Sequence, residues 1–195
     1  MRHLIGVGCG LAGDVCRWSA VLEHASPRYS PRRTLAADAA MIVGPDGDDE
    51  KTPGTVLAHR TLFGAVSRFL EGHAPFPLAG DLVWSPADWA GNPGLWGVVL
   101  PTWHFGAPLL AYDGHVDACQ ALTLLDRCGV RNALLPTALL RAMMNQSVAP
   151  QATHDLDLRT VVSVDGEVAD DVARWTLETF GARLSRGSME RWLAK

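Results

Sequence analysis

Short apolar runs alternate along this chain with longer segments in which apolar residues recur every three or four positions. The short runs predict strands, and the longer segments predict helices. The predicted strands lie at 4–7, 41–43, 82–84, 108–111, 132–135 and 160–164, and the predicted helices at 15–24, 55–71, 94–104, 116–128, 136–145 and 169–180. This order is typical of βα units. We therefore expect an α/β fold with a mostly parallel sheet and helices on both faces, in a single domain over residues 1–195.

The segment at 116–128 shows the helical pattern clearly. Ala118, Ala121, Leu122 and Leu125 share one face, and Gly129 follows as a helix stop. The polar stretch at 147–157 has no such period, so we expect a surface loop there.

The composition is that of a globular protein. With 195 residues, of which 48% are hydrophobic and 19% charged, the chain can bury a core. Its net charge of −4 gives no reason to expect a nucleic-acid partner. No apolar run approaches the roughly 18 residues of a membrane span, and glycines interrupt the first residues, so neither a span nor a signal peptide is expected. The four cysteines form no Cys-x-x-Cys pair, which favours reduced thiols and a cytoplasmic location.

Residues 41–60 have the frame of a phosphate-binding loop, with a predicted strand, a Gly/Pro-rich loop and a predicted helix from 55. Free N–H groups at a helix N-terminus make such a loop a natural anion cradle. Yet the loop carries Asp46, Asp48, Asp49 and Glu50, with Lys51 as the only cation among them. Each carboxylate that faces a triphosphate should oppose it by roughly 1 kcal/mol per charge pair in water.

A second glycine pattern occupies residues 8–13, which read Gly-Cys-Gly-Leu-Ala-Gly after an apolar run. A dinucleotide site would need an acidic residue at the end of a second strand about twenty residues further on. Asp38 is near that distance, but Pro27 and Pro31 interrupt the segment between them. A tight strand-to-helix turn is the favoured interpretation, and a small dinucleotide-binding protein stays open as an alternative.

Several segments together resemble one enzyme family. They are GDLVWSPADWAGNPGLWGVVLPTWH at 80–104, GVRNALLPT at 129–137, and 158–190 with its Gly-Glu loop and closing Gly-x-x-Glu. The loop at 41–60 falls where that family carries its phosphate loop. In this order and spacing the segments resemble the adenylate-forming acyl-CoA synthetases, the AMP-binding ligases. The resemblance runs along nearly all of this chain but covers only the middle of a family member, which is usually more than twice as long.

The resemblance implies a partial adenylate-forming core and a known chemistry. Family members use ATP, Mg²⁺ and a carboxylic acid to make an acyl-adenylate, which coenzyme A converts to an acyl-CoA and AMP. Gly47, Lys51 and Gly54 match positions of the phosphate loop, but the hydroxyl residues of that loop are absent here.

Two further motifs match in part. Gly166 and Glu167 match the family's adenine loop. Gly187 and Glu190 match its Tyr-Gly-x-Thr-Glu motif, in which the Glu holds Mg²⁺. Met189 stands where the phosphate-holding Thr is expected, and a thioether cannot donate that hydrogen bond.

The resemblance points most closely to the acetyl- and medium-chain acyl-CoA synthetases, with an eroded nucleotide site. The family's ribose-binding Asp and catalytic Lys come from later segments, so we assign no catalytic residue and expect no adenylation by this chain alone. A carboxylic acid and coenzyme A would be partners only of an active member. The alternative is a non-catalytic binding or partner subunit, with self-association or a protein partner.

Asp88 and Trp89 have two interpretations. They form either the wall of an acyl or nucleotide pocket, or a helix-capping Asp beside a packed Trp.

Overall fold

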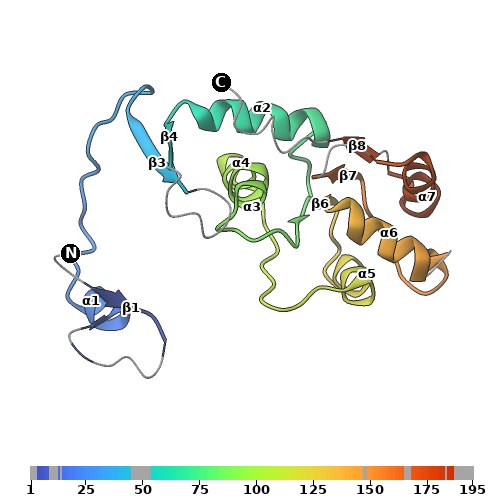
Figure 1. The fold of residues 1–195 in the computed structure, drawn as a ribbon, viewed down its shortest axis with the longest axis horizontal. Coiled ribbons are helices and arrows are strands. Elements are labelled where there is room, and N and C mark those ends of the chain that lie inside the picture. Colours follow the sequence, from blue (N-terminus) through green and yellow to red (C-terminus); the bar gives the residue numbers. More distant parts are fainter. Residues whose placement is uncertain are drawn as a thin grey trace. The chain divides into compact units, whose positions relative to one another are not determined.

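The computed structural model describes residues 4–8, 13, 15–44, 54–146, 149–164, 168–182 and 184–186 (Figure 1). It divides into two compact units, residues 1–35 and residues 36–195. In the described part of the chain, no helix is both long enough and apolar enough to cross a bilayer.

The first unit contains two short parallel strands, β1 (Ile5–Gly6) and β2 (Cys16–Arg17), followed by α1 (Trp18–Glu23). The strand predicted at 4–7 and the helix predicted at 15–24 are both present in shorter form. Strand β2 was not predicted, and it separates the glycine pattern at 8–13 from the helix. The predicted direct turn from strand to helix is therefore wrong, since a strand paired with β1 comes between them.

The second unit begins with an antiparallel hairpin of β3 (Ala39–Val43) and β4 (Thr55–Ala58). We predicted a helix from Thr55, but α2 (Thr61–His73) begins only after a turn. Residues 55–58 instead pair along β3, where Ile42 lies opposite Val56 and Val43 opposite Thr55. The loop after Val43 thus joins two paired strands and does not lead into a helix N-terminus. The predicted cradle of helical N–H groups after this loop is wrong for that reason.

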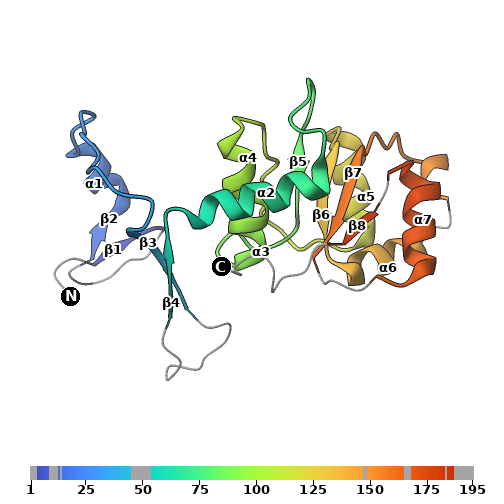
Figure 2. The same cartoon turned by 90° about the horizontal axis from the view of Figure 1, so that it is seen from above.

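The main sheet has four parallel strands in the order β5 (Val83–Trp84), β6 (Asn132–Leu135), β7 (Thr160–Ser163) and β8 (Leu184–Arg186) (Figure 2). On the free side of β5, Leu109 forms a parallel bridge with Val83. The strand predicted at 108–111 is present as this single bridge. The strands predicted at 82–84, 132–135 and 160–164 are confirmed, and β8 is not among the strands that the apolar pattern predicts.

Helices cover both faces of this sheet, as predicted. On one face, Val83, Leu134 and Val162 form an apolar cluster with Phe69 of α2 and Val98 of the π-helical turn Leu95–Val99. That turn joins α3 (Asn92–Gly94) to α4 (Leu100–His104).

On the other face, Ala133, Leu135 and Val161 pack in a cluster with three helices. These are α5 (Ala118–Arg127), α6 (Thr137–Gln146) and α7 (Asp170–Phe180). Figure 1 draws α2 on one side of β6 and β7, and α5 and α6 on the other. The predicted loop at 147–157 contains a short 3₁₀ helix, Pro150–Ala152.

The chain changes direction across the sheet at β5. From β5 it passes through α4 to the segment at Leu109 on one side, and then through α5 to β6 on the other side. In open α/β sheets, ligands bind outside the carboxyl ends of the strands at such a switch point. The carboxyl ends of β5 and of the neighbouring segment are therefore the place to look for a site.

The amino ends of the same strands are joined by a buried polar network. Arg159 donates to both carboxylate oxygens of Asp81, at 2.8 and 2.6 Å, and to the Asn132 Oδ1 at 3.0 Å. The Thr160 hydroxyl also donates to the Asn132 Oδ1, at 2.8 Å. Its single proton is thus used, so the Thr160 oxygen accepts from the Nδ1–H of His73 at 2.6 Å. This network ties α2 and the start of β5 to β6 and β7.

Burial and charge both act on the titration of this network. The interior position of His73 and the nearby Arg159 cation lower the pKa of that imidazole from 6.5 to about 3. Burial alone would raise the pKa of Asp81, but hydrogen bonds from Arg159 and from the Leu78 N–H hold it below its usual value. At neutral pH the network therefore holds a neutral imidazole and an ion pair.

Candidate functional site

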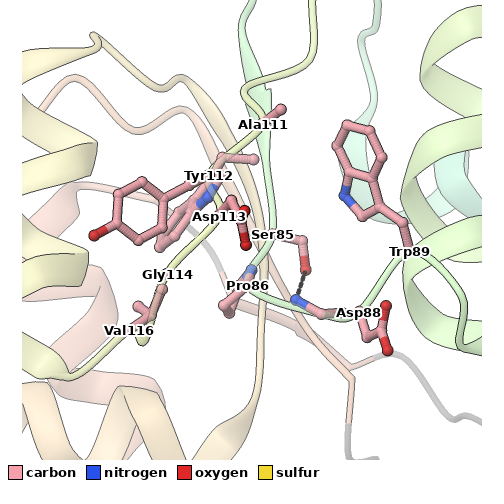
Figure 3. Close-up of a pocket in the computed structure, with 11 residues that line it drawn as sticks. Ser85, Pro86, Asp88, Trp89, Ala111, Tyr112, Asp113, Gly114 and Val116 are labelled. Atoms are coloured by element: carbon pink, nitrogen blue, oxygen red, sulfur yellow. Dashed lines mark hydrogen bonds between the residues drawn. The ribbon is translucent and has the colours of Figure 1, made fainter. Parts of the chain in front are cut away.

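A pocket of about 360 Å³ lies at the carboxyl ends of β5 and the Leu109 segment (Figure 3). Its lining comes from two segments, Trp84 to Trp89 and Ala111 to Val116 with His115 excepted. The segments meet because the Val83 N–H donates to the Pro108 carbonyl at 3.1 Å and the Leu110 N–H donates to the Val83 carbonyl at 2.9 Å. Parallel pairing places both following loops at the same edge of the sheet.

The first loop is held by its own polar groups. Ser85 Oγ accepts from the Ala87 N–H at 3.2 Å, and Asp88 Oδ1 accepts from the Ala90 N–H at 2.9 Å. The Asp88 backbone lies so close to the start of the next helix that a Cβ at Gly94 would stand 2.1 Å from its carbonyl oxygen. Only glycine allows this approach.

Trp89 follows in the pocket wall and meets the edge of Trp103, with ring centroids 6.2 Å apart. Asp88 and Trp89 both line the pocket, and Trp89 also packs on another ring. The predicted helix cap is wrong, because the Asp88 carboxylate accepts from the Ala90 N–H in a local turn and α3 begins only at Asn92.

The second loop brings Tyr112, Asp113 and Gly114 to the pocket. The Tyr112 ring lies over Gly114, where an added Cβ would be 2.9 to 3.0 Å from ring atoms. Sequence reasoning missed these three residues. A signal was available, because the loop follows a predicted strand just as residues 85–89 do, and parallel strands end at a common edge.

The pocket is aromatic and acidic. Its eleven lining residues include the carboxylates of Asp88 and Asp113 but no Lys, Arg or His. Asp113 is exposed, and in the described part of the chain no group donates to its carboxylate or pairs with it. Within the described ranges, no group of three His, Cys, Asp or Glu residues could hold a metal ion. The pocket therefore suits a neutral or cationic group.

Most residues predicted to hold nucleotide or Mg²⁺ lie outside the described residues. These are Gly47, Lys51, Gly166, Glu167, Gly187 and Glu190. Gly54 is described and lies just before β4. It permits close contact with β3, since a Cβ at Gly54 would be 2.8 Å from the Ile42 side chain. The role of Gly54 in phosphate binding stays a prediction.

Two of these predicted motifs follow strands of the main sheet directly. Residues 165–167 come after β7, and 187–190 come after β8. At the carboxyl ends of β6 and β7, the hydroxyls of Thr137 and Ser163 are hydrogen-bonded at 2.7 Å. The strands that precede both motifs therefore end at the same edge of the sheet as the pocket.

No protein-family model matches this sequence, and no curated protein matches it. Solved structures do match. They include an acyl-CoA synthetase from Brucella canis (TM-score 0.79, 22% identity, 94% of this chain and 33% of that one). They also include the anthranilate CoA ligase AuaEII in complex with anthranoyl-AMP (TM-score 0.81, 17% identity, 98% and 37%). A third is a benzoate CoA ligase from Burkholderia xenovorans LB400 (TM-score 0.72, 20% identity, 97% and 37%).

The chain spans about a third of the length of these proteins. The identities are low, so the likeness is one of fold. Over that length, the chain has the α/β fold of the adenylate-forming acyl-CoA and aryl-CoA ligases.

Proposed function

We propose that this chain is an acyl-CoA synthetase-like domain. Its pocket at the carboxyl end of β5 would bind the acyl or aryl group of a carboxylic acid. The observation that carries this proposal is the place of the pocket, at the switch point of a sheet with the adenylate-forming fold. Rigid rings and a few polar groups line it, which is the usual make-up of a small-molecule site. The domain belongs by fold to a lineage of acid–thiol ligases.

We further propose that the chain does not adenylate its ligand by itself. The loop between β3 and β4 carries four carboxylates and one lysine between residues 46 and 51. The phosphates of a nucleoside triphosphate would have to bind against this charge, at roughly 1 kcal/mol for each solvated pair. Met189, beside the expected Mg²⁺ ligand Glu190, also lacks the hydroxyl that would donate a hydrogen bond to a phosphate.

One observation favours a non-catalytic partner subunit as the second candidate. Ile42 and Val56 lie directly opposite each other on the hairpin, and they are 72% and 59% exposed. An exposed apolar pair on a two-stranded sheet offers a contact surface for a protein partner or for self-association. Sedimentation of the chain, compared with an I42T/V56T variant, tests that candidate.

Calorimetry with ATP·Mg²⁺ and with AMP tests the main proposal. We expect no micromolar binding by the natural chain. A variant with Asp46, Asp48, Asp49 and Glu50 each changed to Ser should gain ATP affinity, and adding Lys51→Ala should remove the gain. Exchange of labelled pyrophosphate into ATP by the natural chain with a fatty or aromatic acid would contradict the proposal. Binding of NAD would instead support the dinucleotide alternative.

A further inference from the structure

We infer that the pocket selects an aromatic acid that carries an amino group at the end away from its carboxylate, and that Asp113 accepts from this amino group. The inference rests on the proposed function for the carboxylate part of the ligand. It names the class of acid that this pocket would take.

The shape of the pocket favours a flat ring. Figure 3 draws Tyr112 and Trp89 on opposite sides of the view, with Asp113 between them. Trp89 is braced by the edge of Trp103, and Trp84, only 1% exposed, is fixed beneath the surface. Aromatic walls held in place stack well on another ring at little entropic cost. The volume of about 360 Å³ is at the small end for ligand pockets, which suits a single substituted ring.

The charges of the pocket select the ring substituent. An alkyl chain in the pocket has no donor to offer the exposed Asp113 carboxylate and therefore gains nothing from it. An amino or ammonium group donates to that carboxylate, and a cationic group also gains from the faces of neighbouring rings.

The same charges orient the ligand. Asp88 and Asp113 repel the carboxylate of the ligand, and no residue that lines the pocket offers this carboxylate a cation. The acid group of the ligand therefore points out of the pocket, and the amino group points in. This orientation leaves the carboxylate free at the sheet edge that precedes the predicted nucleotide motifs.

A matched pair of probes tests this inference on the full chain, without nucleotide. The first is 4-(aminomethyl)benzoate, which carries an ammonium group at neutral pH, and the second is 4-methylbenzoate, which lacks it. Calorimetry should show at least about fivefold tighter binding of the first probe. Asp113→Asn should abolish this preference. Asp155→Asn, which removes the same charge from an exposed position outside the pocket, should keep it.

A second variant tests the ring contact. Gly114→Ala should displace the Tyr112 ring, because the added Cβ would stand within 3.0 Å of it. Both probes should then bind more weakly by a similar factor. Equal affinities of the two probes for the natural chain, binding of neither, or a preference that survives Asp113→Asn would each overturn the inference.

These failures are distinguishable from a failure of the proposed function. Binding of octanoate but of neither ring compound would sink the inference and leave the proposed acid site standing. The expected probe preference, combined with no gain of ATP affinity in the four-serine loop variant, would keep the pocket assignment and remove the adenylate-forming interpretation.

Discussion

This protein should lose stability at pH values well above those at which its carboxylates titrate, because His73 is buried as a neutral imidazole. Its side chain is fully buried, and its Nδ1–H donates to Thr160. Its Nε2 has no hydrogen-bond partner among the described residues, so a proton added there would be buried beside the Arg159 cation with no acceptor. The Asp81 carboxylate offsets only part of this cost. The unfolded chain pays no such cost.

The size of the effect follows from the two pKa values. The imidazole pKa is 6.5 in the unfolded chain and about 3 in the folded one. Between these values the unfolded state binds the extra proton, so stability is present above pH 6.5 and is lost as the pH falls. At 1.36 kcal/mol per pH unit, the loss reaches about 3 kcal/mol by pH 4.5 and about 4 kcal/mol by pH 3, where half of the folded molecules already carry the proton.

Urea unfolding at a series of pH values measures this loss. Between pH 6.5 and 4.5 the loss comes from His73 and not from Asp81. The pKa of Asp81 is lowered by folding, so its contribution to stability is lost only as the pH falls below its unfolded pKa of 3.8. His73→Gln cannot titrate and should show a flatter pH dependence, whereas the exposed control His115→Gln should match the natural chain. Equal slopes for His73→Gln and the natural chain, or an imidazole of His73 that titrates near 6.5 by NMR, would refute the reasoning.

Three other changes test the packing. Arg159→Met leaves the 1% exposed carboxylate of Asp81 unpaired and should cost ~3–5 kcal/mol in urea unfolding; a loss under 1 kcal/mol would show that the ion pair contributes little. Gly94→Ala drives a Cβ into the Asp88 carbonyl and should cost ~1–3 kcal/mol, with shifted backbone NMR signals at residue 88; unchanged signals would contradict the close contact. Gly64→Ala, in α2 with open space around its Cβ, should raise the melting temperature through a gain of ~0.5–1 kcal/mol, and a lower one would count against the helix.

The pattern of apolar residues correctly predicted the elements whose buried positions are consecutive or periodic apolar residues. The strand at 132–135 was predicted with its observed bounds, and the helix at 116–128 to within two residues at its start and one at its end. In both, consecutive or periodic apolar residues are buried by the main sheet, so local sequence and final environment agree. The fold class follows from the same alternation.

Elements that depend on a distant partner were missed or misassigned. Residues 55–58 joined a predicted helix, yet β3 offers them a paired strand. Strand β8 is three residues long and exists through its pairing with β7. So short a segment carries too little pattern of its own, and its conformation is decided by backbone hydrogen bonds to a neighbour.

The chain's own sequence thus determined the alternating α/β order, the buried strands, the acidic character of the loop at 46–50 and the resemblance carried by its motifs. Only the tertiary structure decided that Asp113 and Tyr112 line one pocket with the loop of Trp89, because Val83 pairs with Leu109, 26 positions further along the chain. It also decided that the polar residues His73 and Asp81 are buried in one network. Burial and pairing are properties of the space around a residue, and that space is filled by parts of the chain that local sequence does not specify.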